Sequence, residues 1–370
     1  MGKAKNTKTI TNKNMRVALD LFAGGGGLTL GLKQAGFLVS AAVEVDPSAS
    51  ETYLANHPNT VLFQSDIRTI SGLELIRTSP TNKIDLIAAC PPCQGFSQLT
   101  AKYRRKDPRN ELIFEFVRLV REIKPRTIMM ENVPGLAKKG AALFEPAMND
   151  LRTLGYRLSI DVLDTADYGV PQRRQRLVVI GNLGAALDIP KVTHSRDSKK
   201  GTKPWVTVRD AIASEPKPIT LKKSIDAGGP CRVGWHVIRS LSPINLERLR
   251  VIRSGVSRSE LPESLRPKCH QGRDTGFTNV YGRMSWDEPA PTITGGCTTL
   301  SKGRFGHPSQ LRTISVREAA TLQAFPKDYI FKTQYMEKAC DIIGNALPPR
   351  FAKVMAGACL SAIEEYYNAK

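Results

Sequence analysis

The sequence has no long hydrophobic run, which excludes a membrane-spanning helix. Its longest apolar stretch, Leu177–Leu187, is broken by Gly181, Asn182 and Gly184, whereas a spanning helix needs about 20 consecutive apolar residues. With 41% hydrophobic and 24% charged residues over 370 positions, the composition is that of a globular protein and excludes wholesale disorder. The length predicts two domains, or one large domain with an insertion.

Cysteine is scarce and irregularly placed. The chain has 7 cysteines, an odd number with no regular spacing, which argues against a disulfide framework. We therefore expect reduced thiols, a reducing compartment such as the cytoplasm, and a chemical role for any special cysteine.

Acidic residues are few relative to basic ones. Against 34 Asp and Glu stand 54 Lys and Arg, which leaves a net charge of +20 and a surface that attracts polyanions. Nucleic acid is the first partner that this charge indicates, and anionic lipid is the second. Residues 183–334 carry 25 basic and 13 acidic side chains, residues 1–182 carry 25 and 17, and residues 335–370 carry 4 and 4.

From residue 16 onwards, short β-rich runs alternate with helical periodicity, which is typical of an α/β fold with a parallel sheet and helices on its faces. The predicted strands are Val17–Leu21, Leu38–Glu44, Thr60–Phe63, Ile84–Ala89, Thr127–Glu131, Arg157–Leu163 and Arg176–Ile180. The predicted helices are Thr29–Gln34, Ser48–Asn56, Leu112–Ile123, Gly140–Leu154 and Arg350–Tyr367. Polar residues follow the carboxyl ends of several strands, where open α/β sheets bind ligands.

The alternation stops near residue 182, and the following segment is rich in Pro, Gly, Ser, Thr and basic residues. This change predicts four parts. We expect a mobile basic tail over residues 1–14, a first domain over residues 15–182, a less regular domain over residues 183–334, and a C-terminal segment over residues 335–370 that packs back on the first domain.

Four successive glycines, Gly24–Gly27, follow the first strand and precede a helix. A glycine loop at this place lets a ligand approach the backbone closely, but the dinucleotide pattern G-x-G-x-x-G is absent. Glu44 ends the second strand, where it is placed to accept hydrogen bonds from ribose hydroxyls. Asp66 and Ile67 follow the third strand, where they could recognise an adenine amine. These residues favour a nucleoside without pyrophosphate, such as S-adenosylmethionine, over a tight structural turn with two solvated acids.

Cys93 follows the fourth strand in the run from Cys90 to Ser97, CPPCQGFS. A nucleophilic cysteine needs an exposed or electropositive setting that populates its thiolate, and the predicted ligand edge of the sheet offers one. A redox pair of Cys90 and Cys93, or half of a zinc site, are alternatives, although no second C-x-x-C or H-x-x-x-H completes a metal set. Cys90 itself ends an apolar strand and is expected in the core.

Two further elements end at the same edge. Glu131 follows the fifth strand, and a carboxylate there can hold or donate a proton; helix capping or an ion pair is the alternative. Arg174 and Arg176 begin the last strand two residues apart, so they share one face and can point together into the cleft, unless they merely form a solvated basic strand start.

Together these elements resemble the cytosine-5 DNA methyltransferase family. The motifs that carry the resemblance are DLFAG from Asp20, PPCQGFS from Pro91, ENV from Glu131, QRRQR from Gln172, REAATLQAFP from Arg317 and GNALPP from Gly344. They come in the family's order and spacing and cover most of residues 16–182 and 285–360. Residues 183–283 match no motif, and this stretch corresponds to the family's target-recognition region.

The resemblance implies a Rossmann-like, S-adenosylmethionine-dependent methyltransferase domain with a smaller, irregular target-recognition domain. It implies that Cys93 adds to carbon 6 of a cytosine flipped out of the DNA stack, after which carbon 5 takes the methyl group. Glu131 would contact ring nitrogen 3 and the exocyclic amine, and Arg176 the carbonyl oxygen, with Arg174 in support.

The resemblance also implies binding residues. Those for S-adenosylmethionine are Phe22, Gly24, Gly26, Glu44, Asp66, Ile67, Pro92, Leu112 and Asn345. Those for DNA are Ser97, Lys102, Arg104, Arg105, Lys106 and Arg109, in a basic loop that closes over the DNA in family members. Candidate base readers are Arg232, His236, Arg239, Arg248, Arg250, Arg273 and Asn279. No metal site is expected.

The expected substrate is double-stranded DNA, for a monomeric, cytoplasmic and nucleoid-associated enzyme of a prokaryotic cell, with or without a cognate restriction endonuclease. Three alternatives stay open. An RNA methyltransferase on the same scaffold would carry a shorter insert and a Cys-Phe-Thr triplet, which this chain lacks. A catalytically inactive DNA-binding relative would have lost Cys93, Glu131 or Arg176. A flavin or nicotinamide oxidoreductase would need the missing final glycine of the dinucleotide pattern.

Overall fold

The computed structural model describes residues 15–93, 96, 107–198, 201–272 and 278–369. The expected basic tail and five of the six predicted DNA-binding residues lie outside this described part: Ser97, Lys102, Arg104, Arg105 and Lys106. In the described part, no helix is long and apolar enough to cross a membrane.

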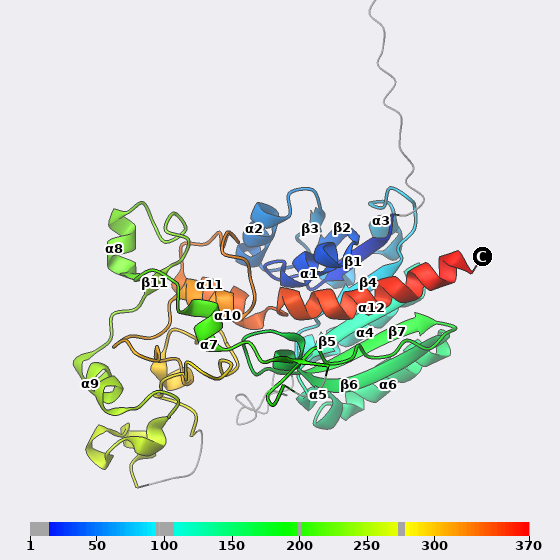
Figure 1. The fold of residues 1–370 in the computed structure, drawn as a ribbon. Helices are drawn as coiled ribbons and strands as arrows, with labels where there is room; N and C mark the ends of the chain where they lie inside the picture. The colour runs from blue at the N-terminus through cyan, green and yellow to red at the C-terminus, as the bar shows by residue number, and fades with distance from the viewer. Residues whose placement is uncertain (1–14, 94–95, 97–106, 199–200, 273–277, 370) are drawn as a thin grey trace, which may run out of the picture.

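A seven-stranded sheet forms the centre of the molecule, with the strand order β3-β2-β1-β4-β5-β7-β6 (Figure 1). Its strands are β1 (Val17–Leu21), β2 (Leu38–Val43), β3 (Val61–Phe63), β4 (Leu86–Ala89), β5 (Thr127–Asn132), β6 (Tyr156–Asp164) and β7 (Gln175–Leu183). β1, β4 and β5 are buried along their whole length, as expected for strands whose two faces are both covered.

The sheet is mixed, which corrects the prediction of a parallel sheet. β7 runs antiparallel to both of its neighbours, β5 and β6. β6 and β7 are joined by a short connection containing the turn Thr165–Tyr168, and only a longer crossover could have brought β7 back parallel. The amino-terminal end of β7 therefore lies at the same edge as the carboxyl end of β5, and the arginines that precede and begin β7 reach that edge.

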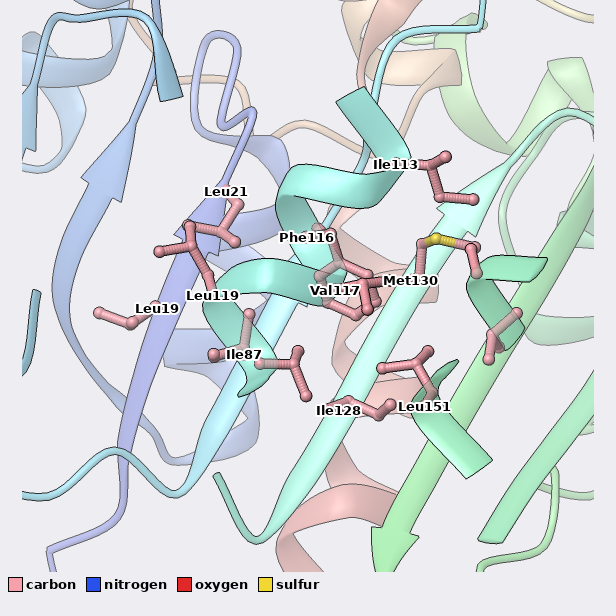
Figure 2. Close-up of a cluster of buried hydrophobic side chains, with 14 of the residues drawn as sticks. Leu19, Leu21, Ile87, Ile113, Phe116, Val117, Leu119, Ile128, Met130 and Leu151 are labelled. Carbon is pink, nitrogen blue, oxygen red and sulfur yellow. The ribbon is translucent and has the colours of Figure 1, made fainter. Parts of the chain in front are cut away.

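The face of the sheet shown in Figure 2 packs against α4 (Ile113–Ile123) and α6 (Ala141–Thr153). Side chains of β1, β4 and β5, including Leu19, Ile87 and Met130, form one buried cluster with these two helices. The opposite face is covered by α1 (Gly27–Ala35) and α12 (Pro349–Asn368), which pack against each other. Both faces are thus sealed by helices, and solvent reaches the sheet only at its edges.

After β7, the described residues of 184–205 run along the sheet domain, where Leu187 packs in the cluster between the sheet and α12 and Trp205 bonds Asp167. The described residues of 206–348 form a second, irregular lobe beside the sheet (Figure 1). Its core gathers side chains from α7, α10 and α11 around the fully buried Trp235. The lobe's helices are α7 (Val208–Ile212), α8 (Leu221–Asp226), α9 (Pro243–Val251), α10 (Val316–Leu322) and α11 (Met336–Asn345). β8 (His194–Ser195) pairs with β9 (Lys203–Pro204) beside the turn Thr165–Tyr168, and β10 (Ile219–Thr220) pairs with β11 (Val237–Ile238) in the lobe.

All seven predicted strands and all five predicted helices are present, and their ends differ from the prediction by at most three residues. The remaining helices beside the sheet are α2 (Pro47–Asn56), predicted over nearly the same residues, and the short α3 (Gly72–Ile76) and α5 (Gly135–Lys138). The last two were not predicted, because each has only one turn or slightly more and too few residues to show a period.

Candidate active site

A pocket of about 840 Å³ lies between the carboxyl edge of the sheet and the second lobe. The sheet domain contributes the ends of β1, β2, β4 and β5 and the start of β7, and the lobe contributes residues 292–295 and α11. The predicted residues that line it are Phe22, Gly24, Glu44, Asp66, Ile67, Pro92, Cys93, Arg109, Leu112, Glu131, Arg174, Arg176 and Asn345. Of the predicted catalytic and cofactor-binding residues, all of which lie in the described part, only Gly26 is missing from this lining.

Glu131 and Arg176 form an ion pair inside the pocket. The Nε of Arg176 lies 2.6 Å from Oε1 of Glu131, and both side chains are about one-tenth exposed. The pair forms because the end of β5 and the start of β7 are antiparallel neighbours. Asn132, next to Glu131, donates to the carbonyl oxygen of Pro91 over 3.0 Å, so the loop that carries Cys93 is tied to the end of β5.

Cys93 is half-buried beside this pair. Burial, and next the negative charge of Glu131, raise the pKa of its thiol to about 12. At this pKa the thiol is neutral at pH 7, and among the described residues no positive charge offsets that of Glu131 at Cys93. Populating the thiolate requires a change in these surroundings, such as a contact that neutralises Glu131.

Cys90 also lines the pocket, and burial raises the pKa of its thiol well above the usual range. Its side chain packs at the edge of the core between the sheet and α12. All seven cysteines of the chain are free, so Cys90 and Cys93 form no disulfide. The described residues contain no group of three or more potential metal ligands.

Two of the three guanidinium nitrogens of Arg174 bond backbone carbonyls, and its buried Nε has no partner among the described residues. Its Nη1 donates to the carbonyl oxygen of Ile293 over 2.8 Å and its Nη2 to that of Gly344 over 2.9 Å. The residue is 3% exposed. Its guanidinium thus ties the start of β7 to the second lobe and to α11 while the residue lines the pocket beside Arg176.

The glycine loop meets Glu44 at the other side of the pocket. The amide of Gly24 donates to Oε2 of Glu44 over 2.7 Å, and the amides of Val45 and Asp46 donate to Oε1. Gly24 has a φ of +53°, and a Cβ placed on it would meet nothing within 4 Å. The loop therefore leaves open space over Gly24, next to a carboxylate whose orientation is fixed by three amides.

Asp66 is half-buried at the rim of the pocket. Arg68 binds both of its carboxylate oxygens, and this pairing lowers the pKa of Asp66 to about 2. Asp66 also caps the short turn Ile67–Thr69. Arg109 lies at the rim as well, exposed and paired with Asp107 at 2.7 Å.

Two pocket residues on α11 were missed by the sequence reasoning. Lys338 forms an ion pair with Asp46 at 3.2 Å, which links α11 to the start of α2. Asp341 lies one turn further along, and both residues line the pocket with Asn345. Their spacing with Asn345, at positions 338, 341 and 345, places the three side chains on one face of a helix. This spacing could have identified Lys338 and Asp341 as pocket residues from the sequence.

Three candidate base readers are bound by their own lobe. His236 bonds Pro216 and Ser315, Arg239 bonds Thr298 and Glu337, and Arg248 bonds the carbonyl oxygen of Leu265. The exposed candidates within the described part are Arg232, Arg250 and Asn279, and Arg273 lies outside it.

The mixed seven-stranded sheet and the glycine loop at its carboxyl edge define the class of the protein. They are the features of a Rossmann-like methyltransferase. Known proteins of this class identify the family more narrowly.

The chain belongs to the C-5 cytosine-specific DNA methylase family, whose model matches residues 16–361. It is 38% identical over 344 residues to the Type II methylase M.HgiDII of Herpetosiphon aurantiacus, covering 91% of this chain and 93% of the relative. It is 35% identical over 347 residues to the Type II methyltransferase M1.HphI of Haemophilus parahaemolyticus, covering 92% and 86%. The protein is therefore a DNA cytosine-5-methyltransferase.

Solved structures agree with this assignment. A candidate DNA modification methyltransferase encoded within an Escherichia coli prophage matches with a TM-score of 0.70 and 27% identity, covering 94% of this chain and 99% of that one. The Dnmt2 methyltransferase of S. pombe, at 18% identity and a TM-score of 0.61, shares the fold.

Proposed function

We propose that this chain methylates carbon 5 of a cytosine in a specific double-stranded DNA sequence, with S-adenosylmethionine as methyl donor. Its catalytic residues would be Cys93, Glu131 and Arg176, with Arg174 in support of Arg176. One observation carries the proposal. The cysteine, the Glu–Arg pair and the glycine loop with Glu44 line a single pocket, so a cytosine and a methyl donor could meet there. The DNA family match favours this substrate over RNA.

Three features of the pocket support the binding of S-adenosylmethionine. The open space over Gly24 admits a ligand against the backbone, and Glu44 retains acceptor capacity for ribose hydroxyls beyond its three amide bonds. Phe22, Ile67, Pro92 and Leu112 offer apolar contact for the adenine. When bound, S-adenosylmethionine supplies an electrophilic methyl group.

Cys93 is the proposed nucleophile. Cys93 gives its thiol proton to water, and its sulfur forms a bond to carbon 6 of the cytosine while the electrons of the 5–6 double bond move to carbon 5. Carbon 5 would take the methyl group of S-adenosylmethionine, whose bond from methyl to sulfonium sulfur breaks. Water then takes the proton from carbon 5, the electrons of that C–H bond restore the 5–6 double bond, and Cys93 leaves as the thiolate. Carbon 6 is inaccessible inside a duplex, so the target base must leave the stack.

Glu131 and Arg176 are proposed to hold the pyrimidine edge. The carboxylate of Glu131 accepts from the exocyclic amine and, when protonated, donates to ring nitrogen 3, while Arg176 donates to the carbonyl oxygen. Protonation of Glu131 would also remove the charge that raises the pKa of Cys93. Substrate binding and thiolate formation would then favour each other.

We propose the remaining organisation from charge and packing. Residues 15–182 form the catalytic domain, residues 183–334 with their excess of basic side chains the target-recognition domain, and residues 335–370 the returning segment, whose α12 packs on α1. The basic loop with Lys102, Arg104, Arg105 and Lys106 would contact phosphates. We further propose a monomer in the prokaryotic cytoplasm that works with or without a cognate endonuclease.

Bisulfite sequencing of DNA from cells that express the chain tests this proposal. We expect protected cytosines at one recurring sequence in cells with the wild-type protein and none in cells with Cys93→Ala. Protection that persists in the variant would overturn the assignment of Cys93, and no protection with a folded wild-type protein would overturn the activity.

A further inference from the structure

We propose that Tyr329 and His57 are positioning residues that hold the glycine loop of the cofactor pocket from behind. This inference rests on the proposed function, since it assigns what fixes the loop that S-adenosylmethionine is proposed to bind. Neither residue lines the pocket formed by the described residues.

Both side chains bond carbonyl groups of the loop. The hydroxyl of Tyr329 donates to the carbonyl oxygen of Gly25 over 2.5 Å. Nε2 of His57 lies 3.0 Å from the carbonyl oxygen of Gly26 and 3.1 Å from the hydroxyl of Tyr329. Two successive peptide groups of the loop are thereby fixed by side chains that are 272 positions apart in the sequence.

The hydrogen-bond roles in this cluster are mutually consistent. Because a carbonyl oxygen only accepts, Tyr329 donates to Gly25 and Nε2 of His57 donates to Gly26. Nδ1 of His57 then accepts from Nζ of Lys33 at 3.4 Å. Burial, and next the charge of Lys33, lower the pKa of His57 to about 4, so at neutral pH the ring stays neutral with its proton on Nε2.

This cluster explains why Gly26 faces away from the pocket. A Cβ on Gly26 would lie 2.5 Å from the ring of His57 and 2.8 Å from the hydroxyl of Tyr329. The neighbouring glycines are confined by residues near the C-terminus. A Cβ on Gly25 would clash with Ile342, and one on Gly27 would lie 2.8 Å from the carbonyl oxygen of Leu347. Packing therefore requires glycine at three of the four positions, whereas a Cβ on Gly24 would meet open space.

Tyr329 is itself anchored by the second lobe. Its carbonyl oxygen accepts from Nη2 of Arg317 over 2.8 Å, and Nε of Arg317 donates to the carbonyl oxygen of Gly234 over 2.7 Å. The ring of Tyr329 packs against those of Phe325 and Phe331. A rigidly held hydroxyl can keep the loop in one conformation, which lowers the entropic cost of binding the cofactor.

Tyr329→Phe tests the inference because it removes the hydroxyl and keeps the ring. We expect KM and Kd for S-adenosylmethionine to rise about fivefold or more, the usual effect of one lost buried hydrogen bond, while kcat changes less than about twofold. Tyr335→Phe is the matched control, because Tyr335 belongs to the same segment but is 69% exposed. Its KM and Kd should equal those of the wild type.

A second set of variants tests the role of His57. His57→Gln keeps an N–H donor and should bind S-adenosylmethionine more tightly than His57→Ala does. In the double variant with Tyr329→Phe and His57→Ala, the fold-increase in Kd for S-adenosylmethionine should be smaller than the product of the fold-increases in the two single variants. The reason is that both residues act on the same loop.

The outcomes separate this inference from the proposed function. If the wild-type protein fails to bind S-adenosylmethionine in calorimetry, the proposed function fails. If the wild type binds and Tyr329→Phe binds equally well, even with a lowered Tm, the hydroxyl is only structural and the positioning role is overturned.

Discussion

Nε of Arg176 lies 2.6 Å from Oε1 of Glu131, and this ion pair is almost completely buried at the edge of the sheet. A buried pair of this kind is costly to break, because removing one partner leaves the other charge uncompensated. The pair also presents a hydrogen-bond acceptor and donor side by side, which matches the amine and carbonyl edge of cytosine. Its position therefore links the antiparallel direction of β7 to the chemistry of the pocket.

Replacing Glu131 by Gln should slow methyl transfer by about 10²–10⁴-fold, the usual contribution of a positioned acid or base. Glutamine keeps the shape of the side chain but cannot supply a proton to ring nitrogen 3. Single-turnover transfer of a labelled methyl group to DNA measures the chemical step directly. Asp150→Asn is the control, since Asp150 forms an exposed ion pair with Arg121 at 3.0 Å; a rate for Glu131→Gln within a few-fold of this control would remove Glu131 from the catalytic set.

Alkylation of Cys93 in the DNA-free protein should be slow at pH 7.5 and should accelerate as the pH rises, because burial and the charge of Glu131 raise the pKa of its thiol to about 12. Cys269 is exposed and serves as the internal control. In Glu131→Gln the raising charge is gone, so Cys93 should react faster at the same pH while Cys269 does not change. Peptide mass spectrometry after timed iodoacetamide treatment measures both rates. Equal rates at Cys93 in the two proteins would contradict the electrostatic account.

DNA that carries 5-fluorocytosine at the target position should trap a covalent adduct on Cys93. Addition of Cys93 to carbon 6 forms the adduct. The adduct persists because fluorine cannot leave carbon 5 as a proton does, so the bond from sulfur to carbon 6 is not broken. Peptide mapping should place the adduct on Cys93, not on the neighbouring Cys90. Cys93→Ala should form no adduct and still bind DNA, whereas Cys269→Ala should form it normally. Absence of an adduct with the wild type, on a sequence that it methylates, would argue against thiol addition.

The sequence predicted the sheet domain well because its signals are local. Each buried strand is a short apolar run, and α4 has a clear apolar face with Phe116, Val117 and Val120 buried. Residues that follow parallel strands meet at the carboxyl edge of the sheet, so the sequence alone assigns Cys93, Glu131 and Glu44 to one pocket.

Features that depend on distant parts of the chain could not be predicted in this way. The direction of β7 depends on how it pairs with β5, and a strand pattern carries no direction. Arg174 and Arg176 are two residues apart, yet Arg174 bonds the carbonyls of Ile293 and Gly344, which no local pattern reveals. The packing of Gly26 against His57 and Tyr329 could not be predicted either, because both residues are remote from it in the sequence.

Binding of the chain to DNA should weaken steeply with salt, by about 10³-fold between 50 and 200 mM if six or more phosphates are contacted. The net charge of +20 motivates this expectation. Fluorescence anisotropy with a labelled duplex measures the slope, and substitution of Lys102, Arg104, Arg105 and Lys106 by Gln should make it shallower. Binding of S-adenosylmethionine measured in the same buffers is the control for general salt effects. A slope near zero would contradict phosphate binding by the basic surface.

Asp20 should make the stability of the protein depend on pH between about 4 and 7. Its carboxyl is buried, with Oδ2 accepting from Thr29 over 2.6 Å and Oδ1 without a partner among the described residues. Burial raises the pKa of Asp20 to about 7, whereas in the unfolded chain it ionises near its usual value of 3.8. Between these values the folded protein holds a proton that the unfolded chain releases, so the contribution of Asp20 to the free energy of unfolding is lost as the pH rises.

Asp20→Asn removes this titration, and urea unfolding of both proteins at pH 5 and pH 8 measures the effect. We expect the variant to gain on the order of 1–3 kcal/mol relative to the wild type on going from pH 5 to pH 8. Burial lowers the pKa of His57 and of His307 to about 4, which makes stability rise with pH, but both histidines are present in both proteins and their effects cancel in the difference. A constant difference across this range would show that Asp20 is already ionised in the folded protein at pH 5.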